Sequence, residues 1–158
     1  MMFGRLMILG AIVAFFANAS PESKSSVTSQ NRDGLAYHDH LGTEALPSTL
    51  DPAQFHDDRT ALVAYSLAGQ IKEMLYQVPC YCPCDKQRGH TSLLDCFTSR
   101  HGAKCPTCQK ELMFCFRKQH EGQSPAQVRK ELAKGKAWRI DLEKTTDYFC
   151  KRIHCPQK

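Results

Sequence analysis

Apolar residues recur at helical spacing in several stretches of this chain, and these stretches predict its secondary structure. A first helix is expected from about residue 58 to 75, because apolar side chains three or four positions apart form one stripe: Val63, Leu67, Ile71 and Met74 or Leu75. Acidic residues favour its N-terminus, and Pro79 follows its end. The stripe would pack this helix against the rest of the domain.

Three further helices are predicted to end before Gly102, Gly122 and Gly135. The first would begin at Thr91 or Ser92, the second has proline in its first turn, and the third opens with the capping-box sequence SPAQ. The alternating residues Trp138, Ile140 and Leu142 predict a short extended segment across the core. A helical turn or two is expected over 145–153.

The pattern contains no series of strands and no internal repeat, so we expect a mainly α fold. The prediction is one small helical domain of about four helices, clamped by a cysteine-rich loop. Residues 20–52 are rich in small polar residues and are expected to be a flexible leader. Residues 53–135 would form the cysteine-rich domain, and residues 136–158 a tail that packs on it.

Residues 1–19 are typical of a secretory signal peptide. Arg5 precedes an apolar run from Leu6 to Phe16, and Ala-Asn-Ala follows it. The run is shorter than the roughly 20 residues of a membrane span. No cysteine follows it to accept a lipid. We therefore expect a periplasmic or extracellular protein that is not an integral membrane protein after cleavage.

Charge and composition exclude some functions. The formal net charge is +5, and most basic residues lie in the second half of the chain. They are scattered, without interleaved aromatic residues, so nucleic-acid binding is not predicted. No serine–histidine–aspartate set, phosphate-binding glycine loop or pair of carboxylates indicates a hydrolase.

The nine cysteines all follow Gln77, and three occupy alternate positions in the sequence PCYCPCD at 79–85. Alternate side chains of an extended segment point the same way, so Cys80, Cys82 and Cys84 can present three sulfurs on one face. Disulfides between these neighbours would have poor geometry. The three thiols must therefore pair elsewhere or share a ligand.

Other metal-ligating residues follow within a short distance. Cys105 and Cys108 lie at a helix start, where backbone N–H groups favour thiolates, and Cys96, His90 and His101 lie between the two motifs. Six cysteines and two histidines can hold two zinc ions, and soft thiolates equally suit Cu(I). An iron–sulfur cluster ranks last, because it would have to be assembled in or carried to the exported compartment.

Two alternatives remain open. Dense cysteines in exported domains often form structural disulfides, which would make this an interaction module without catalysis. Cys105 and Cys108 can instead be the nucleophile and resolving thiol of a thiol–disulfide oxidoreductase, although no thioredoxin-like βαβ pattern accompanies them.

The remaining candidates have supporting roles. A local disulfide is expected between Cys150 and Cys155, and Cys115 should be a buried small apolar residue. Asp85 and Glu111 are candidate acceptors for the N–H groups of ligating histidines.

These residues carry a resemblance to a known family. The segments PCYCPCD (79–85), GH (89–90), SLLDCF (92–97) and HGAKC (101–105), with Cys108 and Glu111, resemble the bacterial exported proteins and lipoproteins named for the PCYCGC motif. The resemblance extends over about 46–135, and Pro83 replaces the motif's glycine. It implies export and a shared cysteine–histidine constellation, but no settled activity.

We therefore expect an exported protein that binds Cu(I) or Zn(II) in a structural or envelope metal-handling role, with another envelope metal or redox protein as its candidate partner. The expected ligands are Cys80, Cys82, Cys84, Cys96, Cys105, Cys108, His90 and His101.

Overall fold

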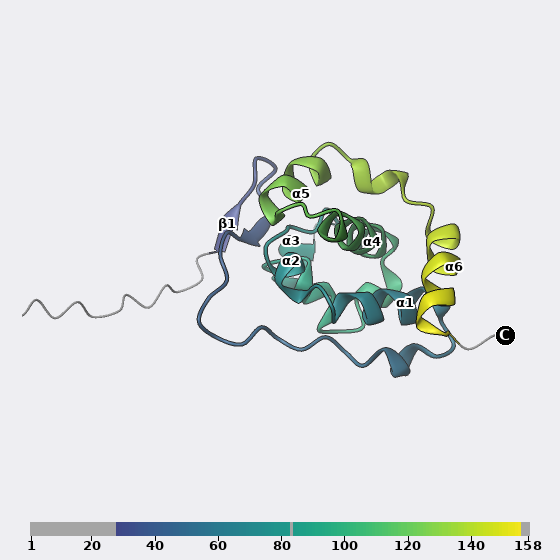
Figure 1. Cartoon of the computed structure of the whole chain (residues 1–158). Coiled ribbons are helices and arrows are strands. Elements are labelled where there is room, and N and C mark those ends of the chain that lie inside the picture. The colour runs from purple at the N-terminus through teal and green to yellow at the C-terminus, as the bar shows by residue number, and fades with distance from the viewer. Residues whose placement is uncertain (1–27, 83, 156–158) are drawn as a thin grey trace, which may run out of the picture.

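The computed structural model describes residues 28–82 and 84–155, and helices dominate this part of the chain (Figure 1). The expected signal peptide, residues 1–19, lies outside the described residues. The α-helices are α1 (Arg59–Ala68), α2 (Lys72–Tyr76), α3 (Cys84–Arg88), α4 (Pro106–His120), α5 (Pro125–Leu132) and α6 (Leu142–Ile153). Short 3₁₀ helices are η1 (Pro52–Phe55), η2 (Leu94–Phe97), η3 (Gly102–Lys104) and η4 (Lys136–Arg139). The mainly α fold agrees with the sequence prediction.

Helix α4 is the centre of the domain. It packs against α1, α2, α5 and α6, which surround it in Figure 1. Cys105 precedes the helix in an extended conformation, and Pro106 supplies the fixed φ of its first turn. Leu112, Met113 and Cys115 are fully buried or nearly so, and they form the middle of the apolar core. No helix in the described ranges is long and apolar enough to cross a bilayer.

The single helix predicted over 58–75 is wrong, because α1 and α2 are separate helices. Asp58 caps α1 by accepting a hydrogen bond from the backbone N–H of Ala61 at 3.0 Å. The backbone leaves helical geometry at Ile71, where φ is −125° and ψ is 31°. The residues of the expected apolar stripe are nevertheless buried, because the apolar side of α2 faces the same core as that of α1.

Helix α5 agrees closely with its prediction. Both hydrogen bonds of the expected capping box, between Ser124 and Gln127, are present. In contrast, the helix predicted to begin at Thr91 or Ser92 is only the 3₁₀ helix η2. Asp95 accepts hydrogen bonds from the backbone N–H and hydroxyl of Thr91, at 2.6 and 2.9 Å, and so holds the loop in front of η2.

The extended segment predicted around Trp138 is also wrong. Residues 136–139 form η4, and the indole of Trp138 is half exposed. Helix α6 follows and packs on α1 and α4, with Thr146 and Cys150 facing inward. Cys150 and Cys155 form a disulfide with an S–S distance of 2.00 Å.

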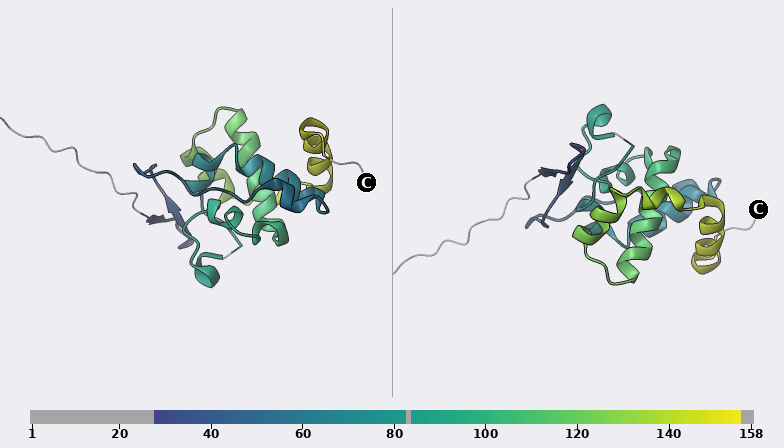
Figure 2. Two further views of the ribbon diagram at one scale, coloured as in Figure 1. Left: turned by 90° about the horizontal axis from the view of Figure 1, so that it is seen from below. Right: turned by 90° about the horizontal axis from the view of Figure 1, so that it is seen from above.

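Part of the segment expected to be a flexible leader has defined structure. Strands β1 (Thr28–Gln30) and β2 (Ala36–His38) form an antiparallel hairpin in which Ser29 pairs with Tyr37. Figures 1 and 2 show this hairpin and α6 at opposite ends of the domain. The buried ring of His38 stacks on Tyr76 with centroids 3.9 Å apart.

The hairpin is tied to the segment that carries the cysteines. The side-chain amide of Asn31 donates to the hydroxyl of Tyr81 at 2.9 Å, and Nε2 of His38 lies 3.1 Å from Oγ1 of Thr91. Arg129 of α5 donates to the backbone oxygen of Gln77 at 2.7 Å and to Asp39 at 3.1 Å. Gln77, which precedes the alternate cysteines, is thereby held by α5, and Thr91, which follows them, by the hairpin.

Candidate metal centre

The loop that carries Cys80 and Cys82 is held by a buried carboxyl group. Both side-chain oxygens of Glu111, on α4, accept from the backbone N–H of Tyr81, at 3.0 and 3.2 Å. Glu111 is 1% exposed, and burial raises its pKa to about 8. In the structure Glu111 contacts the Tyr81 N–H and the Cys80 thiol, and its expected role as an acceptor for a histidine N–H stays a prediction. The side chain of Asp85 lies outside the described residues.

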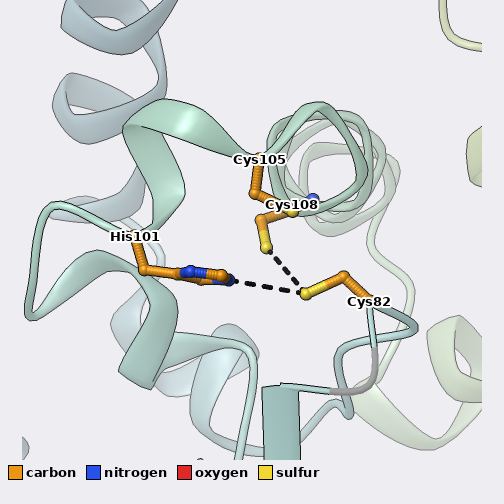
Figure 3. A group of neighbouring side chains, drawn as sticks. All are labelled: Cys82, His101, Cys105 and Cys108. Carbon is orange, nitrogen blue, oxygen red and sulfur yellow. Dashed lines mark hydrogen bonds between the residues drawn. The ribbon is translucent and has the colours of Figure 1, made fainter. Parts of the chain in front are cut away.

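One group of four ligands lies at the N-terminus of α4, and we call it the outer set: Cys82, His101, Cys105 and Cys108. Their ligand atoms all lie within 4.8 Å of one another. In Figure 3 the sulfur of Cys82 points toward both His101 Nε2 and the sulfur of Cys108, each 3.5 Å away. The backbone N–H of Cys108 donates to the sulfur of Cys105 at 3.5 Å, as expected for a helix start that stabilises a thiolate.

The other four ligands form the inner set: Cys80, Cys84, His90 and Cys96. The sulfur of Cys96 lies 3.4 Å from that of Cys84 and 3.4 Å from Nδ1 of His90. The sulfur of Cys80 lies within 4.8 Å of those of Cys84 and Cys96. It also lies 3.5 Å from that of Cys108, so the two sets are in contact.

The sulfur separations fit metal ligation better than disulfide bonding. A disulfide has an S–S length of about 2.0 Å. Four sulfurs bonded to one zinc ion at about 2.3 Å would form a tetrahedron with edges of about 3.8 Å. The closest thiol pairs of the centre are 3.4 to 3.5 Å apart, and all six cysteines are free. The structure therefore brings the eight predicted ligands together in overlapping groups, of which the outer set is one group of four.

Crowding among these thiols makes them titrate unequally. Contact with Cys105 is the largest influence that lowers the pKa of Cys82, whereas contact with Cys105 raises that of Cys108. A thiolate at one position therefore disfavours charge at its neighbours. A bound cation would remove this conflict, because it allows adjacent thiols to be deprotonated together.

The electrostatics give little support to Cys105 as a redox nucleophile. Contact with Cys108 is the largest single influence on the pKa of Cys105 and favours the thiolate, but contact with Cys82 and burial together outweigh it and raise the pKa. Cys115 is apart from the centre. It is fully buried on α4, and burial raises its thiol pKa.

Sequence reasoning missed Tyr65 of α1. Its hydroxyl donates to the backbone oxygen of Ser99 and accepts from the backbone N–H of Ala103 at 3.2 Å. These two bonds hold the chain on either side of His101. A tyrosine beside the apolar stripe of a helix is the available signal, since a buried tyrosine hydroxyl needs hydrogen-bond partners.

Comparison with known families agrees with the motif. A family model described as a protein of unknown function with PCYCGC motif matches residues 6–137. The chain belongs to this family. The resemblance in the sequence was expected to start at about residue 46, but the match begins well before it. The similarity to PCYCGC members therefore includes the hairpin region as well as the centre. No curated protein and no solved structure matches the chain.

Proposed function

We propose that this PCYCGC-family protein is exported and binds a soft metal ion, Cu(I) or Zn(II), in a structural role or for metal handling at the cell envelope. The observation that carries the proposal is the convergence of six free thiols and two imidazoles, with neighbouring ligand atoms 3.4 to 3.5 Å apart. Soft thiolate ligands favour these ions over oxygen-seeking cations such as Mg²⁺.

Export rests on the N-terminal sequence, in which a short apolar run follows Arg5. A metal-loaded state is compatible with an oxidising compartment, because thiolates bound to an ion are protected from pairing with one another. The Cys150–Cys155 disulfide is the kind of bond that such a compartment permits.

The proposal is tested by expressing the whole chain with export allowed and purifying it without a chelator. Bound metals and free thiols are then measured on the same sample. We expect stoichiometric copper or zinc, no disulfide among the six cysteines of the centre, and N-terminal processing near residue 19. A metal-free protein with these six cysteines oxidised would instead support a disulfide-stapled module.

A matched pair of variants tests the ligands. Cys82→Ser removes a sulfur that lies 3.5 Å from both His101 Nε2 and the sulfur of Cys108, so it should lower bound metal and stability together. Cys115→Ser changes a buried thiol outside the centre and should leave the metal content unchanged. Full metal retention in Cys82→Ser would remove that residue from the ligand set.

A further inference from the structure

The eight predicted ligand atoms can be divided into two sets of the same composition, each with the three sulfurs and one imidazole nitrogen that a tetrahedral zinc ion can take. The four atoms of the outer set all lie within 4.8 Å of one another. In the inner set the atoms of Cys84, His90 and Cys96 do so, and the sulfur of Cys80 lies within the same distance of those of Cys84 and Cys96. We infer that the centre binds two ions, a kinetically inert ion in the inner set and an exchangeable ion in the outer set. This inference rests on the proposed function, because it assigns different roles to two parts of the same centre.

The two sets differ in their access to solvent. Cys80, Cys84 and Cys96 of the inner set are 5%, 1% and 0% exposed, and only His90 is half-buried. The outer set is more exposed. Its members Cys82, His101 and Cys105 are half-buried, and only Cys108 is fully buried. A ligand that competes for the outer ion can therefore approach it from solvent, whereas the inner ion is shielded by protein.

The elements that carry the ligands reinforce this difference. Cys96 lies in η2 between Leu94 and Phe97, both fully buried, so moving its sulfur would disturb the core. Cys105 lies between exposed Lys104 and exposed Pro106, at the boundary of η3 and α4. Segments with few buried contacts open at lower free energy than the core. Cys105 can thus release a metal without disrupting the fold.

The acceptor for the exchangeable ion must supply soft donors that replace the thiolates of the outer set. Thiolates are the ligands that both Cu(I) and Zn(II) accept. The acceptor class is therefore a molecule or protein that offers thiolates.

Zinc release into a competing chromophore tests this assignment. The whole chain is loaded anaerobically with two equivalents of Zn²⁺ and mixed with excess 4-(2-pyridylazo)resorcinol, and the absorbance of the zinc complex is followed. We expect two phases of equal amplitude whose rates differ by about tenfold or more. Release of both ions in one phase, or binding of only one ion per chain, would overturn the inference while leaving metal binding intact. Failure to retain any Zn²⁺ would overturn the proposed function itself.

Histidine variants assign the phases. His101→Ala should abolish the fast phase and leave one slowly released ion, whereas His90→Ala should remove the slow phase and destabilise the fold. His120→Ala is the control, because this imidazole contacts the backbone oxygen of Phe116 on α4 and belongs to neither set. A His101→Ala variant that keeps the fast phase would overturn the assignment.

Alkylation gives a readout that needs no substitution. After the fast phase, wild-type protein is treated with iodoacetamide and the modified cysteines are mapped by mass spectrometry. Cys82 and Cys105 should be alkylated, while Cys84 and Cys96 should be protected by the remaining ion and by burial. Equal alkylation of all four cysteines would contradict the division into two sets.

Discussion

Gly102, which directly follows His101 and begins η3, is tightly packed beside the metal centre. A Cβ atom at this position would lie 2.8 Å from the Phe97 ring and 2.9 Å from the backbone oxygen of Cys96. Ordinary contacts begin near 3.4 Å, so Gly102→Ala must displace its neighbours by about half an ångström. The ring of Phe97 is fully buried and edge-on to Tyr65, which leaves it little room to move.

We expect Gly102→Ala to lower the free energy of unfolding by about 1–3 kcal/mol, the usual cost of overpacking. The displacement also separates the segments that carry Cys96 and His101, so zinc affinity should fall by about tenfold. Both quantities can be measured on the zinc-loaded protein, by urea denaturation at fixed free zinc and by competition with a chromophoric chelator.

Gly69→Ala is the matched control for this prediction. A Cβ at Gly69 would have its nearest neighbours at 3.5 and 3.8 Å, and φ is −59°, which alanine adopts readily. This variant should be neutral or more stable by about 0.4–1 kcal/mol, because alanine restricts the unfolded chain. If Gly102→Ala proves as stable as Gly69→Ala and binds zinc equally well, the packing argument is wrong.

Three further predictions concern the supports of the centre. Tyr65→Phe leaves the backbone groups of Ser99 and Ala103 without their hydroxyl partner, so it should lower the free energy of unfolding in urea by about 1–3 kcal/mol. Its control, Tyr148→Phe at an exposed ring, should leave that free energy almost unchanged. Glu111→Ala removes the acceptors of the Tyr81 N–H and should weaken zinc binding in competition titrations, whereas Glu111→Gln keeps one acceptor and should lose less. Replacing both Cys150 and Cys155 by serine should lower stability by about 2 kcal/mol without changing the zinc content; a loss of zinc would show that the disulfide supports the centre.

The candidate ligands could be selected from the sequence because their chemistry is concentrated in a short segment. Three alternate cysteines and a Cys-x-x-Cys pair at a helix start restrict the interpretation strongly. Helix α5 was predictable for a similar reason, since the Ser124–Gln127 capping box is a local signal. Such features depend on neighbouring residues alone.

Features that depend on tertiary packing were not predictable. The residues around Ile71 continue the apolar stripe, so the pattern could not reveal the break between α1 and α2. Alternation over Trp138, Ile140 and Leu142 was too short a run to separate a strand from helical turns. The contact between Glu111 and the Tyr81 backbone spans 30 positions in the chain, and the division of the ligands into two sets requires their positions in space.

The eight candidate ligand side chains all come from residues 80–108, which has a consequence for the order of folding. Short loops lose little entropy on closure, so an ion can gather these side chains at small cost. Helices α5 and α6 contribute none of the eight, and they follow this segment in the chain. An ion captured early would therefore provide a nucleus of local contacts, onto which the rest of α4 and then the C-terminal helices dock.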